Sequence, residues 1–517
     1  MHIFAGLEIG KRSIMTHQSA LNITGHNVAN VNTPGYTRQS PNIVTSPPWH
    51  TPVLTGNSRA GQFGTGVDVI SIDRLRDRFL DEQIRNETRT LGYWDSMQES
   101  LSRLEVILNE PSTDGLRGVM DQFWESWQDL SSHPESESVR SVVTQRGMAM
   151  AEAFNHTYRQ LKELREDANT NIHVKVDEIN SIAQQLSDLN KQILSISVAG
   201  KEPNDLLDKR DLLLDQLASI ADIKVYEQRN IVDESTGAVK RFSGMITVQL
   251  GGRSLVQGTD YHRLDTQPDG ESMNLIVWED TRVKADIQGG ELRGLLDVRG
   301  KTLLETGPSE YKEIIPNLIN DLNRMAKTLI MTTNNLHQTG FSLNNQTAIA
   351  DGTNFFNQPA DPTDPAINWA EFFSVDLTII NDPKNIAAAA NATWDALGNK
   401  INFGDGGIAL QIARLKHQGY SGADTSLIQN VTVDDFWRAI CAFVGVDSQE
   451  ASRMARNQDT LLGELENKRQ SLSGVSLDEE MTNMIKFQHA YNAASRFITA
   501  IDEQIDVIVN RMGLVGR

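Results

Sequence analysis

The residue types that most often carry out catalysis are thinly spread along this chain. Its eleven histidines form no His-Glu-x-x-His pair and no set with cysteine at metal-ligand spacing. No Gly-x-Ser-x-Gly nucleophile motif occurs. His17 and His26 lie nine residues apart in a predicted helix, which places them on different faces about 13 Å apart along the axis. The sequence therefore predicts no catalytic, metal-binding or cofactor-binding residue.

Three other features suggest chemistry, but each has a simpler structural explanation. Residues 61–66 loosely resemble a glycine-rich phosphate loop, yet no strand–helix unit or following lysine supports that function. The single cysteine, Cys441, lies in an apolar run, which favours core filling and excludes an internal disulfide. The acidic residues Asp478, Glu479 and Glu480 fall in the first turn of a predicted helix, where the helix dipole favours negative charge.

The clearest pattern in the chain is a heptad repeat at the C-terminus. Five apolar pairs follow one another at seven-residue spacing: Met484/Phe487, Tyr491/Ala494, Ile498/Ile501, Ile505/Ile508 and Met512/Val515. Ser476 and Glu479 form a predicted capping box just before the repeat. The pattern predicts a helix from residue 476 to the end, about 60 Å long. Such a stripe needs other helices to cover it.

A second, weaker heptad repeat begins near the N-terminus. Its apolar positions are Leu7, Ile14, Leu21 and Val28. Their companions at the other seam position are Gly10, His17 and Thr24, which are not apolar. Helical repeats at both ends predict that the chain leaves and returns to the same place, with its terminal helices paired as a coiled coil.

Composition excludes several classes of protein. The 517 residues suffice for about three domains. The net charge of −20 argues against nucleic acid as a partner, because phosphate binding needs clustered Lys and Arg. We expect no membrane-spanning segment, because no apolar stretch approaches 18 residues. The first residues lack the basic and apolar regions of a standard secretory signal.

The middle of the chain is predicted to alternate between long helices and a small β region. Helices are expected at about 73–109, 137–198, 204–220, 311–338 and 447–471, and strands at 223–226, 245–250, 275–278 and 373–380. The helix at 137–198 would reach about 90 Å. The predicted fold is mostly α with an inserted β domain, an α+β multidomain chain with a long helical rod and a small outer β domain.

These elements divide the chain into seven predicted segments. They are the N-terminal helix of the inner coiled coil (1–40), the first part of the rod (41–221), the β domain (222–288), a helical return (289–340), a variable insertion (341–432), the last part of the rod (433–475) and the C-terminal helix (476–517).

A turn motif ends the N-terminal helix. Asn30 and Asn32 suit a helix end, and Thr33 is held extended by the proline that follows. Pro34 and Gly35 fit the centre of a type II turn. The motif as a whole comprises Asn27, Asn30, Asn32, Thr33, Pro34, Gly35 and Tyr36.

The turn motif and the C-terminal repeat together closely resemble the flagellar rod, hook and hook-associated proteins of bacteria. Internal stretches at 203–211, 289–299, 352–356 and 476–481 are similar to the members of that family that form the hook–filament junction. The resemblance covers both ends and most of residues 66–340, and it is weakest over 341–430.

The resemblance implies a structural role without a reaction. The terminal helices would form the inner layer of a tube, be disordered before assembly and fold on polymerisation. The expected partners are copies of the chain, hook protein below, a second junction protein and flagellin above, and an export chaperone on the C-terminal helix. Export through the flagellar type III apparatus would place the protein outside the cell, on the flagellum.

Two other functions remain open from sequence. The nearer alternative is a hook or distal rod subunit, which shares both terminal motifs but lacks the long helical middle. The farther alternative is a secreted enzyme or adhesin with its activity in residues 340–430 or in the β domain. The missing metal and nucleophile motifs disfavour it.

Overall fold

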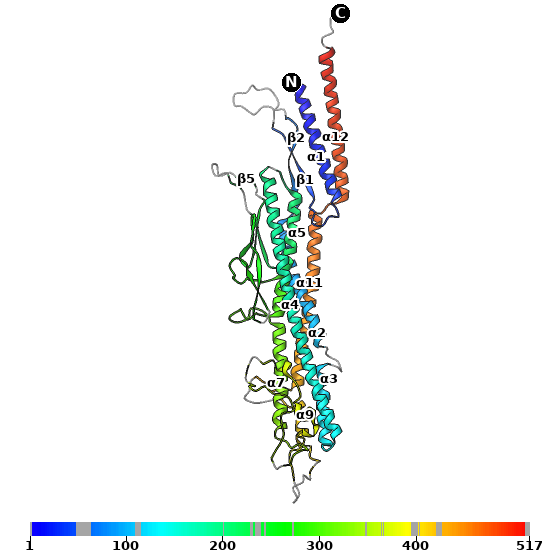
Figure 1. Cartoon of the computed structure of the whole chain (residues 1–517). Helices are drawn as coiled ribbons and strands as arrows, with labels where there is room; N and C mark the ends of the chain where they lie inside the picture. Colours follow the sequence, from blue (N-terminus) through cyan, green and yellow to red (C-terminus); the bar gives the residue numbers. More distant parts are fainter. Residues whose placement is uncertain are drawn as a thin grey trace.

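The computed structural model is a long rod with both chain ends near one tip (Figure 1). It describes residues 3–47, 64–108, 115–199, 201–227, 231–232, 239–241, 244–270, 273–346, 349–362, 364, 367–393, 402, 404–419 and 426–511. The chain runs from the tip along the rod, turns at the far end and returns to the tip. This path agrees with the predicted α+β chain whose two terminal helices meet.

The helices account for most of the described residues. They are α1 (Ile3–Ala29), α2 (Arg78–Leu108), α3 (Leu116–Ser132), α4 (Glu137–Val198), α5 (Asn204–Ile220), α6 (Gly290–Arg299), α7 (Ile314–His337), α8 (Trp369–Phe372), α9 (Leu377–Asn381), α10 (Gly407–Arg414), α11 (Val433–Ser473) and α12 (Leu477–Asp506). The strands are β1 (Gln39–Thr45), β2 (Val67–Arg74), β3 (Ile223–Glu227), β4 (Ile231–Val232), β5 (Val239–Arg241), β6 (Ile246–Leu250), β7 (Arg253–Gln257), β8 (Asp260–Tyr261), β9 (Leu264–Pro268) and β10 (Asn274–Trp278).

Helix α4 is the backbone of the rod. Its bounds are those predicted, and Ser136 caps its first turn by accepting a hydrogen bond from the Val139 backbone N–H. At 62 residues it is about 93 Å long. Its predicted apolar positions Ile172, Ile179 and Leu186 are buried, as the heptad pattern required. Helices α2, α5, α6 and α7 pack along it.

The β domain is held on α4 by side-chain amides. Strands β3, β6, β7 and β8 form an antiparallel sheet in that order. Asn180 on α4 donates to the Leu264 carbonyl at 2.9 Å and accepts from the Leu264 N–H at 2.8 Å. Asn190, ten residues further along α4, donates to the carbonyls of Ile246 and Gly258. These polar bonds set the register between helix and sheet, which apolar contact alone would not.

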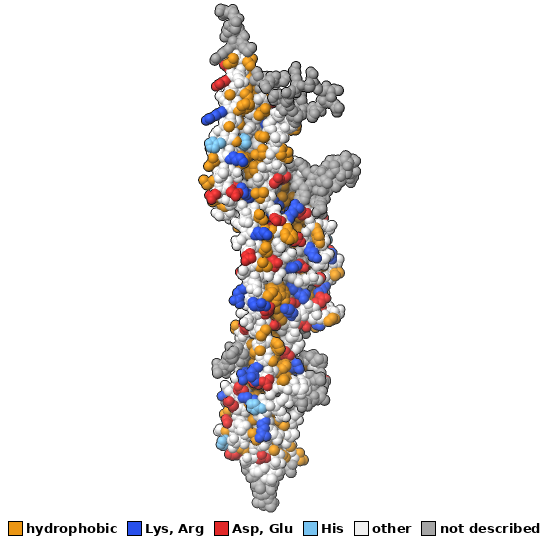
Figure 2. All heavy atoms as spheres, turned by 180° about the vertical axis from the view of Figure 1, so that it is seen from behind, with side chains coloured by type: hydrophobic (Ala, Val, Ile, Leu, Met, Phe, Trp, Pro, Cys, Tyr) orange, Lys and Arg blue, Asp and Glu red, His pale blue; other side chains and the backbone are white. Residues whose placement is uncertain are grey.

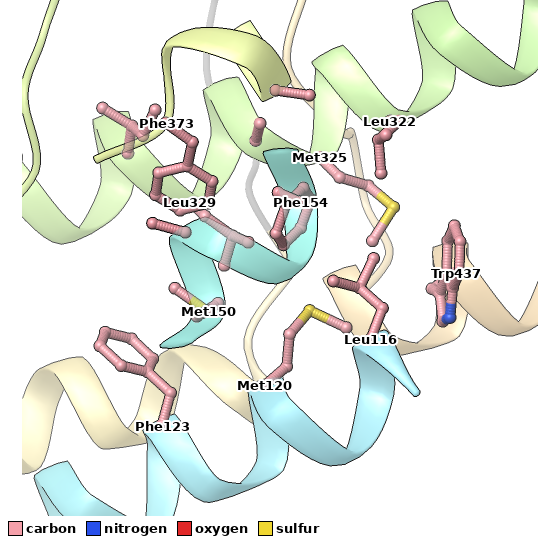
Figure 3. Close-up of a cluster of buried hydrophobic side chains, with 14 of the residues drawn as sticks. Leu116, Met120, Phe123, Met150, Phe154, Leu322, Met325, Leu329, Phe373 and Trp437 are labelled. Atoms are coloured by element: carbon pink, nitrogen blue, oxygen red, sulfur yellow. The ribbon is translucent and has the colours of Figure 1, made fainter. Parts of the chain in front are cut away.

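The far end of the rod contains an aromatic and aliphatic core (Figure 3). That view shows side chains of α3 (Phe123), α4 (Phe154) and α7 (Leu329) in one buried cluster, and the Phe373 ring lies 5.1 Å from the Phe154 ring. Asn334 holds the loop with Phe355 and Phe356 by accepting from both backbone N–H groups at 2.9 Å.

The glycine that precedes this loop is required by space. A Cβ on Gly352 would lie 1.9 Å from the His337 carbonyl oxygen, so no other residue fits. The Gly-x-x-Phe-Phe stretch singled out from sequence is thus a packing motif of this end of the rod.

Several sequence expectations are wrong in detail. Residues 373–380 are not a strand, because Asp376 caps the short helix α9 by accepting from the Thr378 N–H. Helix α2 begins at Arg78 rather than near 73, since β2 continues to Arg74. Helix α11 begins at Val433, fourteen residues before the predicted start at 447, with Thr432 as its cap. Cys441 is half-buried at the edge of the core rather than inside it.

The buried His337 makes the far end of the rod sensitive to acid. Its side chain is completely buried, donates through Nδ1 to the Thr353 carbonyl at 2.5 Å and accepts the Ala387 N–H through Nε2 at 2.8 Å. Burial lowers the pKa of His337 to about 4. The unfolded chain therefore takes up a proton near pH 6.5 that the folded chain refuses until about pH 4.

We predict that stability falls by about 3 kcal/mol between pH 6.5 and pH 4 through this residue alone. The His337→Gln variant should be less stable at pH 7 but show a flatter dependence on pH. Urea unfolding at pH 7 and pH 5, followed by tryptophan fluorescence, measures this, since Trp127 lies 6.3 Å from the His337 ring. The exposed His133→Gln is the control. Equal pH slopes in both variants would contradict the prediction.

Candidate functional site

The terminal helices α1 and α12 pack side by side in antiparallel orientation. Gly6 lies against Ile501, Gly10 against Ile498, and His17 stacks 6.3 Å from Phe487. Residue numbers rise on one helix as they fall on the other, which defines the antiparallel register. The predicted pairing of the two chain ends is therefore present within a single chain.

The predicted seam residues are only partly covered by this pairing. Ala494 and Ile501 are buried, Met484, Phe487, Tyr491, Ile498 and Ile505 are half-buried, and Ile508 is 41 % exposed. Leu7, Ile14, Leu21 and Val28 are half-buried. Met512 lies outside the described residues, and the regular helix ends at Asp506, before a π-helical turn at Val507–Arg511. Pairing of α1 with α12 therefore leaves the apolar seam of each helix partly exposed.

Small residues on α1 allow the close approach. A Cβ on Gly6 or Gly10 would lie 2.5 Å from the side chain of Ile501 or Ile498. Gly10 and Thr24, which weakened the N-terminal repeat in sequence, are buried in the structure. The interface consists of large residues on α12 set against small ones on α1. A search for apolar residues alone therefore underrates α1.

The turn motif redirects the chain from α1 into β1. The Tyr36 N–H bonds to the Thr33 carbonyl at 3.2 Å, and Gly35 has φ +77°. These values fit the predicted type II turn. Asn30 supports the turn by accepting from the Thr33 hydroxyl at 3.1 Å. Asn32 and Pro34 are exposed.

Asn27 is the centre of the motif, and all four of its hydrogen-bonding positions are filled. Its Nδ2 donates to the Gln39 carbonyl at 2.9 Å and to Glu480 Oε2 at 3.1 Å. Its Oδ1 accepts from the Tyr36 hydroxyl at 2.7 Å and from the Gln39 N–H at 3.0 Å. Asn27 is 1 % exposed, so these bonds replace all contact with water. One side chain thus joins α1, the turn, β1 and α12.

Arg38 and Glu480 connect the same point to the rod. Arg38 Nε donates to Glu480 Oε1 at 2.8 Å, and Glu480 is 2 % exposed. The Arg38 backbone N–H binds the carbonyl of Ser473, the last residue of α11, at 2.9 Å. A second guanidinium nitrogen of Arg38 reaches Glu479 Oε2 at 2.5 Å. We call Asn27, Tyr36, Arg38 and Glu480 the clasp.

The clasp corrects the predicted role of the first turn of α12. Ser476 occupies the cap position, but in the described structure its side chain caps nothing and Glu479 is turned toward Arg38. The capping box is therefore absent. Glu479 and Glu480 bind residues far away in the chain rather than in their own helix.

A ladder of carboxylates on α5 receives the extended segment that follows the turn. Gln39 donates to Asp205 at 2.9 Å, and the Thr37 N–H donates to Asp208 at 3.0 Å. The ladder occupies one face of α5 at spacings of three and four residues and comprises Asp205, Asp208, Asp211 and Asp215.

Four arginines from other elements hold the ladder in place. Arg74 bridges Asp208 and Asp211 at 2.8 and 2.9 Å. Arg76 reaches Asp211 at 3.3 Å. Arg85 of α2 and Arg469 of α11 each bind Asp215 at 2.8 Å. The ladder therefore ties β2, α2 and α11 to α5.

Neighbouring arginines keep the buried carboxylate at the centre of the ladder charged. Burial by itself would raise the pKa of Asp211, but Arg76, Arg210, Arg74 and Arg85 outweigh it and lower that pKa. The same partnership raises the pKa of Arg76 against the effect of its burial. Both groups remain charged at neutral pH, so the ladder stays intact there.

Sequence reasoning found part of this site. It singled out every member of the turn motif and the stretch that contains Asp205, Asp208 and Asp211. It placed Glu480 only in a first helical turn favoured by the helix dipole, and it gave no role to Arg38, Arg74 or Arg76. Asp residues recurring at three- and four-residue spacing are visible in the sequence. Their arginine partners are far away in the chain and could not be assigned without the fold.

The described residues show no sign of a metal centre or a membrane span. No three His, Cys, Asp or Glu side chains within the described ranges gather so that they could hold a metal ion. No described helix is both long and apolar enough to cross a bilayer.

Family models match three parts of the chain. One, described as the flagellar hook-associated protein FlgK helical domain, matches residues 101–356. The flagellar basal body rod FlgEFG protein C-terminal model matches 467–512, and the flagella basal body rod protein model matches 7–37. The last two cover α12 and α1 with the turn. These matches, with the paired terminal helices, define a flagellar axial protein.

Relatives along the full length identify the family within that class. Flagellar hook-associated protein 1 of Bacillus subtilis is 35 % identical over 99 % of both chains. Flagellar hook-associated protein 1 of Escherichia coli is 24 % identical over 95 % of this chain and 97 % of its own. The chain belongs to the flagellar hook-associated protein 1 family, and it is a structural subunit of the flagellar axis at the hook–filament junction.

A solved structure supports the fold. The flagellar hook junction protein FlgK from Burkholderia pseudomallei matches with a TM-score of 0.60 at 15 % identity. The match covers 76 % of this chain and 100 % of that one.

Removing Glu480 should loosen the root of the terminal helix pair. Glu480→Ala leaves Asn27 Nδ2 and the Arg38 guanidinium without their buried acceptor, which costs on the order of 3 kcal/mol. Glu479→Ala removes an exposed ion pair and should cost less than about 1 kcal/mol. Hydrogen exchange over residues 20–40 of the purified chain measures the difference. Equal exchange in the two variants would show that the clasp does not hold the helices.

Two glycine substitutions on α1 should have opposite effects. In Gly10→Ala the new methyl group displaces Ile498, so exchange over residues 494–501 of α12 should become faster. In Gly25→Ala the Cβ meets nothing within 4 Å, and the helix should gain about 0.5–1 kcal/mol. Hydrogen exchange of both full-length variants tests this. Slower exchange in both would mean that backbone propensity, not close packing, governs α1.

Proposed function

We propose that this protein builds one layer of the tube at the hook–filament junction through contacts between copies of its terminal helices. The observation that supports this most directly is the incomplete cover of the α12 seam. Of the seam residues that the structure describes, Ala494 and Ile501 alone are buried, while Ile508, in the π-helical turn after α12, is 41 % exposed. Helices of neighbouring copies are the natural cover for the rest of the stripe.

The energetics of the seam support assembly-dependent stability. Burying roughly 100 Å² of apolar surface per seam residue is worth a few kcal/mol per heptad at about 25 cal/mol/Å². Ordering seven residues costs a similar amount or more. The terminal pair is thus marginal in a single chain and becomes stable when neighbours cover it.

The clasp and the ladder give the assembled layer its geometry. They join the root of the helix pair to α2, α5 and α11 by charged bonds with little exposure. A change in the tilt of the pair would break several buried bonds at once. We propose that the protein works through graded subunit contact of this kind and not through catalysis.

The remaining partners follow from membership of the family. Hook protein lies below the layer, and a second junction protein and flagellin lie above it. The flagellar type III apparatus exports the chain to the outside of the cell. An export chaperone covers the C-terminal helix beforehand, because its exposed apolar seam would otherwise self-associate.

A charge on the seam should block assembly without unfolding the rod. Ile501→Asp places a carboxylate against Gly6 at the buried interface. We expect secreted, folded protein that does not enter the flagellum, with urea unfolding of the central helices unchanged. The exposed Ala500→Asp carries the same charge one residue away and is the control. Loss of the central unfolding transition in Ile501→Asp would contradict this division of roles.

Deletion of the gene tests the proposed function. Electron microscopy of the cells should show hooks of normal length without filaments, with flagellin lost to the medium. Absent hooks would instead place the protein in the rod or hook. Normal flagella would overturn the proposal.

A further inference from the structure

One exposed apolar surface lies where α11 passes into α12. Leu472, Leu477, Met481 and Ile485 are 50, 47, 57 and 53 % exposed. The last three recur every four residues, so they share one side of α12. Met481 and the buried Ala494 are thirteen residues apart, which is about 140° around the helix. Met481 is therefore turned away from α1, whereas Leu477, seven residues before Met484, continues the seam. We call the four exposed residues the α12 patch.

A second apolar surface lies on β2 and the start of α2. Ile70, Leu75 and Phe79 are 70, 39 and 69 % exposed. Ile70 belongs to a ribbon of only two strands, β1 and β2, which is marginal without further cover. We call these three residues the β2 patch.

The two patches lie at the same height of the rod on different sides. The Arg38 N–H binds the Ser473 carbonyl, and the Arg38 carbonyl accepts the Leu75 N–H, both at 2.9 Å. Because Arg38 binds both residues through its backbone, Leu75 and the end of α11 lie at the same height along the rod. Figure 1 shows the ribbon on one side of α1 and α12 on the other.

The size of the patches limits what they can bind. Together the seven side chains expose on the order of 600 Å² of apolar surface, comparable with the largest patch of an ordinary monomer. Contact between one α12 patch and one β2 patch falls below the 1,200–2,000 Å² of a stable pair. Such a contact holds only when it is repeated and accompanied by others, as in a closed layer of subunits.

We propose that the α12 patch of one copy packs against the β2 patch of the next copy in the layer. This contact joins different surfaces of identical chains, so repetition at one height generates a ring or a helical layer rather than a two-fold dimer. It is continuous with the seam, because both lie on α12, and Figure 2 shows hydrophobic side chains along this upper part of the rod. The inference rests on the proposed assembly of copies into a junction layer.

Cysteine pairs test which surfaces meet. In a Cys441→Ser background, Leu477→Cys and Phe79→Cys are combined in one chain, and isolated flagella are oxidised. We expect a series of disulfide-linked dimers, trimers and larger oligomers on a non-reducing gel. Each single variant should remain monomeric on the gel, because in this arrangement a cysteine faces an apolar side chain of the neighbour.

Charge pairs test the same contact in the native-cysteine background. Met481→Glu and Phe79→Lys should each reduce the number of filamented cells several-fold, and the two together should recover a substantial part of it. Met481→Lys with Phe79→Lys is the matched control and should not recover.

The outcomes separate the contact from the function. If the double-cysteine chain forms no disulfide-linked oligomers in cells that grow filaments, the contact is overturned and the junction function still stands. A disulfide-linked dimer from Leu477→Cys alone would show a two-fold contact and overturn the proposal as well. If the unsubstituted chain fails to restore filaments to a deletion strain, the proposed function itself fails.

Discussion

The structure depends on one buried amide. Asn27 uses both donors and both acceptors to join α1, the turn, β1 and α12, and it does so with almost no exposure to water. An unpaired polar group at such a place is costly, so each of these elements is held where the bonds are complete. Glu480, shared between Asn27 and Arg38, extends the constraint to the end of the rod. The C-terminal end of α1 and the N-terminal end of α12 are therefore fixed relative to each other by polar bonds, while the apolar stripes of both helices remain partly open.

This division between polar root and apolar seam has a functional consequence. Buried, directional bonds specify orientation, whereas apolar area supplies affinity without direction. At the root the carboxylates of α5 meet arginines from three elements, which leaves little freedom in the tilt of the helix pair. Along the seam the side chains can meet helices of other copies. The orientation of α1 and α12 relative to the rod is therefore fixed before the subunit joins a layer.

Polar bonds also position the β domain on the rod. Asn180 and Asn190 bind backbone groups of the sheet, so the domain has one register along α4. At the far end, His337 and Asn334 do the same for loops around the aromatic core. Buried side chains of α4 and α7 thus place each loop or sheet by hydrogen bonds to its backbone, and the apolar core then fills the space between.

Sequence patterns were enough to predict the long helices, the small β region, the meeting of the chain ends and the turn at Pro34 and Gly35. These features depend on local periodicity and on backbone preferences, which are written in neighbouring residues. Three-dimensional packing determines that Glu479 and Glu480 bind Arg38 instead of capping α12, and that Gly10 is an interface residue. Each of these outcomes depends on partners hundreds of residues away or on the space left by another helix. Such distances are set by the fold and are absent from the local pattern.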